Sequence, residues 1–154
     1  CAKRYMDDIL MIYAQDPRWD STQFCHEFKA SECYQKPLKL EDGDANTFLE
    51  TRLFVRGNQF RYKLKNDNES DCKVWRYQHF HSHTPYAQKR ALLTARLRKV
   101  QQMASDPDML YQSGLAKVRE FQAIRYPIPM LRAACNYLAA STGERTWLNV
   151  RDTL

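Results

Sequence analysis

The sequence has little glycine and proline and no long apolar run. Only four of its 154 residues are glycine and six are proline, so it contains no low-complexity linker. The longest unbroken apolar stretch runs from Ile9 to Ala14, which is far too short to span a bilayer. No charged segment leads into an apolar run near Cys1, so the sequence predicts neither a signal peptide nor a membrane partner.

The chain also lacks paired cysteines and the common nucleotide-binding loops. Its five cysteines stand at positions 1, 25, 33, 72 and 135, without a Cys-x-x-Cys pair. An odd number at wide spacing predicts reduced thiols in an intracellular protein rather than a disulfide framework. The sequence contains no Walker loop and no GxGxxG motif, and no Cys/His or Ser/His/Asp catalytic set can be assembled from it.

What the chain does contain is a basic excess and enough apolar residues for a core. Hydrophobic residues make up 44% and aromatic residues 12%, which excludes disorder throughout. The 24 Lys and Arg exceed the 18 Asp and Glu, giving a formal net charge of +6. Five basic residues and no acidic residue lie between Lys89 and Lys99. Such an excess favours a nucleic acid over a membrane surface as the partner, although many proteins carry it as plain solvated surface.

The first half of the chain predicts two β-hairpins and a helix. Tyr5-Met6-Asp7-Asp8 followed by Ile9 to Tyr13 indicates a hairpin with the aspartates at its tip, and a buried helix is the alternative for that apolar run. Asp20-Ser21 is an N-cap signal for a helix over about 21–31. The sequence predicts a short strand over 38–40 and a second hairpin around Gly57-Asn58, with strands over 48–55 and 60–64.

The second half predicts three helices. The first spans about 86–104, and the second begins after Asp106-Pro107 and reaches about Ala123, with Gly114 as a weak point. The third follows Pro129 and ends near Gly143, a plausible C′ glycine. We therefore expect an α+β chain in which a β-rich part over 1–66 and a connector over 67–85 precede a helical part over 86–154.

Tyr5-Met6-Asp7-Asp8 is the motif with the clearest chemical meaning. Two adjacent carboxylates repel each other and cannot be buried without compensation. Mg²⁺ provides that compensation, and two such ions about 3.5–4 Å apart can bind the attacking and leaving oxygens of a phosphoryl transfer. The alternative is an ordinary Asp-Asp turn between strands.

With its flanks, Arg4-Tyr5-Met6-Asp7-Asp8-Ile9 resembles the metal-binding motif of reverse transcriptases, and the chain is most similar to the branch of Penelope-like retroelements and telomerase. Three further segments carry the resemblance: Thr47-Phe48-Leu49-Glu50 through Tyr62-Lys63-Leu64-Lys65, Phe80-His81-Ser82-His83-Thr84-Pro85, and Arg125-Tyr126-Pro127. The sequence departs from the family where Arg125 replaces a usual glycine and where Glu50 replaces a usual aspartate.

The resemblance implies a partial polymerase palm over 1–66 followed by a helical, thumb-like bundle over 86–154. It implies that Asp7 and Asp8 are catalytic and bind Mg²⁺ or Mn²⁺, and that the partners are an RNA template, a DNA primer and a dNTP. A further metal-binding aspartate and the fingers would precede Cys1. We therefore expect the chain to be the C-terminal portion of an RNA-directed DNA polymerase of a retroelement, a nucleotidyltransferase in its full-length form and inactive as a fragment.

Further cations fit the same interpretation. Lys36 and Lys39 stand where such polymerases place a lysine near the phosphates of the nucleotide, and solvated strand-edge lysines are the alternative. Arg61, Lys63 and Lys65 alternate on one strand and are candidates for a primer grip. The solvent face of a half-covered sheet is equally consistent with that spacing.

The helix after Tyr86 supplies the candidate nucleic-acid-binding residues Lys89, Arg90, Arg96 and Lys99. Lys89 and Arg96 project beside the apolar face of this helix, within roughly 60° of its centre. They would contact backbone phosphates of a duplex or form ion pairs with the β-rich part.

Two further possibilities complete the sequence-based account. His79, His81 and His83 would share one face of a strand, but no fourth ligand has suitable spacing, so the sequence does not predict a zinc site. The alternative function is a non-catalytic basic domain that binds RNA or DNA, in which Asp7-Asp8 is only a turn.

Overall fold

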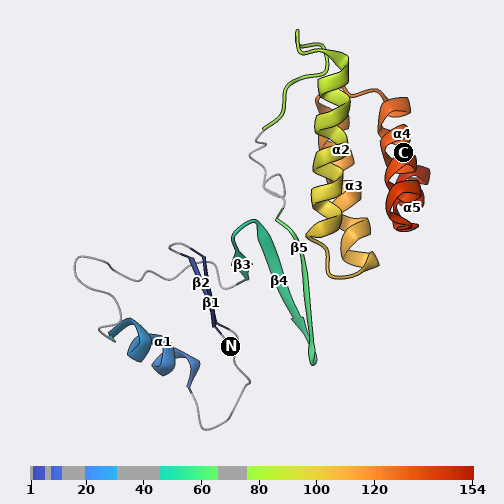
Figure 1. Ribbon diagram of the computed structural model, residues 1–154. Helices are drawn as coiled ribbons and strands as arrows, with labels where there is room; N and C mark the ends of the chain where they lie inside the picture. The colour runs from blue at the N-terminus through green and yellow to red at the C-terminus, as the bar shows by residue number, and fades with distance from the viewer. Residues whose placement is uncertain (1, 6–7, 12–19, 31–45, 66–75) are drawn as a thin grey trace. The chain divides into compact units, whose positions relative to one another are not determined.

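The computed structural model describes residues 2–5, 8–11, 20–30, 46–65 and 76–154. The chain divides into two compact units, Cys1–Leu49 and Glu50–Leu154. The described residues form five helices and small antiparallel β-structures (Figure 1), so the fold class is α+β, as expected. The sequence-based boundary at residue 66 would separate the second hairpin from the helices, whereas the second compact unit contains both.

The described residues of the first unit form the first hairpin, one helix and a short strand. β1 (Ala2–Tyr5) pairs antiparallel with β2 (Asp8–Met11), and Tyr5 opposite Asp8 is the pair nearest the connection. The hairpin is thus confirmed, and Ile9 to Met11 lie in a strand rather than in the alternative helix. β3 (Thr47–Phe48) ends the unit, while the strand expected over 38–40 lies outside the described residues.

Helix α1 (Ser21–Ala30) confirms the predicted N-cap. A carboxylate oxygen of Asp20 accepts a bond from the backbone N–H of Thr22 at 2.9 Å, which satisfies one of the free donors at the helix start. Phe24 and Phe28 stack one turn apart with ring centroids at 6.5 Å. The N-cap and this aromatic pair are local features that favour the helix.

The second unit begins with the second predicted hairpin. β4 (Thr51–Arg56) pairs antiparallel with β5 (Gln59–Leu64) through a two-residue turn, in which Gly57 has a φ of 59°. Glycine suits that left-handed conformation because it has no Cβ. Directly opposed residues lie on the same face. One face is therefore apolar, with Leu53 opposite Tyr62, and the other is basic, with Arg52 opposite Lys63.

Among the described residues of this unit, four helices follow the hairpin (Figure 1). They are α2 (Tyr86–Gln102), α3 (Pro107–Ala123), α4 (Ile128–Thr142) and α5 (Thr146–Asp152). α2 packs on α3 and α4, and α5 also packs on α3 and α4. The three predicted helices are confirmed, and α5 was not predicted. The largest fully buried side chains of the core are Trp147 and Phe121, with Leu93, Leu97, Leu131 and Leu138.

Gly114 is a contact point between helices rather than a weak point. A Cβ at this position would lie 3.0 Å from Cζ3 of Trp147, whose indole is fully buried. The indole N–H donates to Gln101 at 2.9 Å, which fixes the orientation of the ring. Absence of a side chain at Gly114 therefore lets α3 approach α5 closely.

The end of α3 combines ideal hydrogen bonding with an unfavourable residue. The N–H of Tyr126 donates to the carbonyl of Phe121 at 3.1 Å, and the N–H of Arg125 donates to that of Gln122 at 3.0 Å. The rings of Phe121 and Tyr126 lie with their centroids 4.9 Å apart, and this contact completes a Schellman motif. Arg125 occupies the C′ position with a φ of 70°, a conformation that favours glycine.

We predict that Arg125→Gly stabilises the protein by about 1 kcal/mol, because relief of the left-handed strain outweighs the greater freedom of glycine in the unfolded chain. Urea unfolding would measure the change. Gly143, which ends α4 with a φ of 74°, is the matched control, and Gly143→Ala should destabilise by about 1 kcal/mol. Destabilisation by Arg125→Gly would contradict this account of the turn.

Candidate nucleic-acid interface

The basic excess of the chain lies in its helical part. Residues 86–154 contain eleven Lys and Arg against five Asp and Glu, so they hold the whole formal excess of six, whereas residues 1–85 are balanced. All five acidic side chains have partners within the second unit. The partners are Arg61 for Asp106 and Asp108, Lys117 for Glu120, Thr146 for Glu144, and Arg151 for Asp152. The acids are thus largely occupied within the protein, which leaves cations on the surface.

Arg61 of β5 holds the hairpin against the start of α3. Its Nε donates to Asp106 Oδ2 at 2.8 Å, and its Nη2 donates to Oδ1 of the same carboxylate at 2.5 Å. The N–H of Met109 donates to Oδ1 at 3.1 Å, so Asp106 is also the N-cap of α3, as the sequence predicts. Hydrogen bonding to Arg61 holds the pKa of Asp106 well below its usual range and raises the pKa of Arg61.

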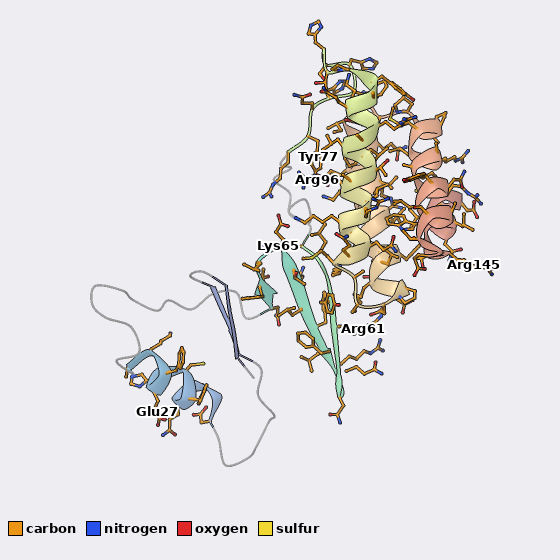
Figure 2. The ribbon with its side chains drawn as sticks, in the orientation of Figure 1. Glu27, Arg61, Lys65, Tyr77, Arg96 and Arg145 are labelled. Carbon is orange, nitrogen blue, oxygen red and sulfur yellow. The ribbon has the colours of Figure 1, made fainter. Side chains whose placement is uncertain are left out.

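Backbone bonds next to this ion pair reinforce the junction. The N–H of Ser105 donates to the carbonyl of Tyr62 at 2.9 Å, and the N–H of Tyr62 donates to the Ser105 hydroxyl at 3.0 Å. That hydroxyl donates to Asp106 at 2.6 Å. Arg61, a primer-grip candidate, is therefore engaged in joining β5 to α3 (Figure 2).

The other two primer-grip candidates have different surroundings. Lys63 lies with its ammonium 5.5 Å from the ring centroid of Phe54, and Arg52 lies 5.9 Å from the same centroid. This face of the hairpin thus combines cations with an aromatic ring. Lys65 follows the strand and is exposed. Its backbone N–H donates to the Glu50 carbonyl at 2.7 Å, and this bond closes the open end of the hairpin.

Lys89 is buried within the second unit. It is only 6% exposed, its Nζ donates to the backbone carbonyl of Ser82 at 2.6 Å, and the ammonium lies 5.3 Å from the centroid of Phe80. This is neither a phosphate contact nor an ion pair with the hairpin, the two possibilities that the helical pattern suggested. The contact instead fastens residues 80–82 to the first turn of α2.

Arg96 and Lys99 of α2 contact residues that precede the helices in the second unit. The guanidinium of Arg96 lies 5.3 Å from the ring centroid of Tyr77 (Figure 2), and Lys117 lies 5.4 Å from the same ring. Lys99 forms an ion pair with Glu50, which holds the pKa of that carboxylate below its usual range, with Arg96 adding a smaller effect. Lys99 is the cation of this helix that pairs with the hairpin segment.

Arg90 is the remaining candidate for nucleic-acid binding on α2, and the structure identifies Arg98 as a further one. Both are exposed on α2, and within the described part of the chain neither side chain has an acidic partner. Such a cation costs little to bring to a phosphate because no existing bond is lost. Arg98 lies in the basic stretch that the sequence singled out, but its exposure depends on which helix face packs inward.

The predicted metal and nucleotide residues lie mostly outside the described part of the chain. Asp7, Lys36 and Lys39 are not described, and Asp8 is described only as the first residue of β2. Within the described ranges, no group of three or more His, Cys, Asp and Glu side chains is placed to hold a metal ion.

The three alternating histidines lie in a turn region before α2 rather than in an assigned strand. The Nδ1 of His79 accepts a bond from the backbone N–H of His81 at 3.2 Å, and the two rings are 5.3 Å apart. Cys25 is partly buried on α1 and free, while Cys33 and Cys72 lie outside the described residues.

Comparison of the chain with protein-family models, with curated proteins and with solved structures found no match. No helix among the described residues is long and apolar enough to cross a membrane. The functional argument therefore rests on the residues and geometry described above.

We predict that Asp106→Ser destabilises the protein at pH 7, because serine can still cap α3 but cannot form the ion pair with Arg61. A carboxylate with a depressed folded-state pKa contributes stability above its unfolded pKa of about 4, and this stability is lost as the pH falls below that value. The difference in urea midpoint from the parent should therefore shrink at pH 3. Asp106→Ala should cost about 1 kcal/mol more at pH 7 because it also removes the cap. Equal midpoints for parent and Asp106→Ser at pH 7 would contradict the role of the pair.

We also predict opposite behaviour for two neighbouring cations. Lys89→Gln should cost about 2 kcal/mol of stability, because it removes a charged donor from a buried carbonyl. It should leave the salt dependence of RNA/DNA hybrid binding unchanged. Arg90→Gln should leave stability within about 0.5 kcal/mol and reduce the log–log salt slope by about 0.9. Thermal unfolding and fluorescence anisotropy measure both effects, and a flattened slope for folded Lys89→Gln would refute this division of roles.

Proposed function

We propose that this chain is part of an RNA-directed DNA polymerase, in which the β1–β2 hairpin carries the metal-binding motif and the second unit binds the template and primer. The observation that carries the proposal is the strand register. Tyr5 pairs with Asp8, so the four residues Tyr5-Met6-Asp7-Asp8 begin and end on paired positions of one antiparallel hairpin. Residues Asp8–Met11 form strand β2 and not the alternative buried helix, which would have left the motif without a hairpin.

The chemistry of the motif supports the same proposal. Adjacent carboxylates supply hard oxygen ligands, which Mg²⁺ and Mn²⁺ accept. Asp7 and Asp8 would hold the metal together with an aspartate outside this chain. The bound ions would stabilise charge on the attacking primer hydroxyl and on the pyrophosphate leaving group. The protein's own contribution would be to position the primer end and the nucleotide.

The second unit supports binding of a polyanion. The acidic side chains of residues 86–154 are engaged internally, whereas Arg90, Arg98 and Lys65 are exposed. A positive surface attracts the phosphate backbone of a nucleic acid, and this attraction does not depend on the base sequence. Arg61 and Lys89 would support this surface rather than contact the duplex, since each already has partners in the protein.

In a longer protein that extends this chain at its N-terminus, Asp7→Asn should abolish dNTP incorporation, at least a thousandfold below the parent. Affinity for the RNA/DNA hybrid should stay within about twofold, because the change lies at the reacting centre and not on the basic surface. Primer extension and anisotropy on the same preparation measure the two quantities. Arg4→Gln, which alters charge beside the motif but no carboxylate, is the control. Full extension by Asp7→Asn would refute the polymerase assignment.

A second candidate function is a non-catalytic domain that binds RNA or DNA. It is favoured by the compactness of Glu50–Leu154, which contains the basic helices. The two candidates differ in their dependence on metal. Only the polymerase requires the carboxylates of the first hairpin, so hybrid binding without any metal-dependent incorporation by the longer protein would favour the second candidate.

A further inference from the structure

A groove lies between the tip of the second hairpin and the first turn of α3. Its volume is about 570 Å³, which is within the usual range of ligand-binding clefts. A second cavity of about 310 Å³ adjoins it along α3 and shares Pro107 and Asp108 with it, so the depression suits an elongated ligand. The lining residues of the first groove are Gln59, Phe60 and Arg61 of β5, followed by Ser105, Asp106, Pro107 and Asp108.

The wall formed by β5 is an open strand edge. Within the described part of the chain, β5 is the outer strand of its sheet (Figure 1). The backbone N–H and C=O of Tyr62 both bond to Ser105, so they point away from β4. Backbone groups two residues apart in a strand point the same way, and those of Phe60 therefore face the groove. No group among the described residues bonds to them, which leaves them free to pair with an added strand.

The two faces of the hairpin beside this edge differ in character. Phe60 and Val55 oppose each other on one face and are 42% and 77% exposed. The other face carries Arg61, which binds both oxygens of Asp106. The side chain of Asp108 is 80% exposed and contacts Arg61 through one oxygen, at 3.3 Å. The two carboxylates outnumber the one guanidinium among the lining residues, so the groove is negative by one formal charge.

This combination favours a basic peptide over a nucleic acid as the occupant. A phosphate backbone would be attracted to the exposed cations elsewhere on the helices and repelled by Asp108. An extended peptide, in contrast, would pair with the backbone of Phe60 and place an apolar side chain beside that ring. Its next side chain would point to the opposite face of the sheet, where the carboxylates lie. A lysine or arginine at that position would bind Asp108.

We propose that the groove binds an extended peptide segment of a protein partner, in which an apolar residue is followed by lysine or arginine. The segment adds a short antiparallel strand to the edge of β5. The apolar residue lies opposite Phe60 and exchanges two backbone hydrogen bonds with it, and the basic side chain pairs with Asp108. This inference goes beyond the proposed function, because it concerns a protein partner and uses none of the exposed cations assigned to nucleic-acid binding.

Fluorescence anisotropy with two pools of labelled hexapeptides tests the proposal. Each pool is randomised around a fixed central pair, which is Val-Arg in one pool and Val-Glu in the other. The Val-Arg pool should bind the full chain saturably and about threefold more tightly than the Val-Glu pool, as expected of one exposed ion pair. Nonspecific attraction predicts the opposite preference, because the chain has a formal net charge of +6. Preference for the Val-Glu pool, or no saturable binding by either pool, would overturn the proposal.

Asp108→Asn tests the position of the basic side chain. The variant should bind both pools equally, whereas its melting temperature should change little because Asp106 still caps α3 and pairs with Arg61. Asp152→Asn is the matched control, since this exposed carboxylate pairs with Arg151 outside the groove, and it should retain the preference. A threefold preference that persists in folded Asp108→Asn would show that the peptide does not use this carboxylate.

Methylation of the peptide backbone tests the pairing with β5. An N-methyl group on the fixed valine of the Val-Arg pool should weaken binding about fivefold, because it removes the bond to the carbonyl of Phe60. An N-methyl group on the fixed arginine is the control, since the N–H of that residue points away from β5 in the proposed pairing. Equal effects of the two methyl groups would refute addition of a strand at this edge.

Two other occupants would give distinct results, and each would overturn the peptide assignment. A single-stranded oligonucleotide that displaces the Val-Arg pool, and whose own binding is weakened by Phe60→Ala, would assign the groove to nucleic-acid bases. A dimer of the parent chain that dissociates when the pool is added, as measured by analytical ultracentrifugation, would assign the edge to a second copy. Loss of the peptide assignment with RNA/DNA hybrid binding intact would leave the proposed function standing.

Discussion

The bidentate pair between Arg61 and Asp106 determines the geometry of the second unit. Asp106 uses one carboxylate both to accept from Arg61 and to cap α3, so the orientation of the hairpin and the start of the helix depend on the same group. A planar guanidinium opposite a carboxylate fixes direction as well as distance, which a lysine would not do. Ser105 adds bonds to the backbone of Tyr62 and to the carboxylate itself. The surfaces of β5 and α3 therefore move together.

The parts of the fold that follow from local chemistry were predictable from the sequence. Asp106-Pro107 and Gly143 mark helix ends because caps and left-handed turns involve only neighbouring residues. Helix α5 lacks a usual N-cap residue, since Arg145 precedes it, and the carboxylate of Glu144 instead accepts the backbone N–H of Thr146 at 3.0 Å. Its position depends on Trp147 packing against Gly114, a contact between residues far apart in the sequence. For the same reason, the sequence alone predicts a weak point at Gly114, because it does not show the contact with Trp147.

The charged residues show a sharper limit of sequence reasoning. Helical periodicity placed Lys89 beside the apolar face, and the structure confirms that the residue is buried there. Periodicity could not supply its partner, the backbone carbonyl of Ser82, because a long side chain can reach several groups around its helix. Lys99, which was grouped with Lys89, pairs with Glu50 instead. Helical spacing therefore predicts on which side of the helix a cationic side chain lies, whereas its partner depends on how the helices and strands pack.

The internal partners of the cations determine which of them can bind an external ligand. A cation that already neutralises a carboxylate or a buried carbonyl must give up that partner before it can bind phosphate, and the group left behind would be destabilised. Arg61 and Lys89 are therefore poor candidates for direct contact, although their sequence positions suggested it. Lys65, Arg90 and Arg98 carry no such cost. Internal pairing thus selects a smaller set of cations than the net charge implies.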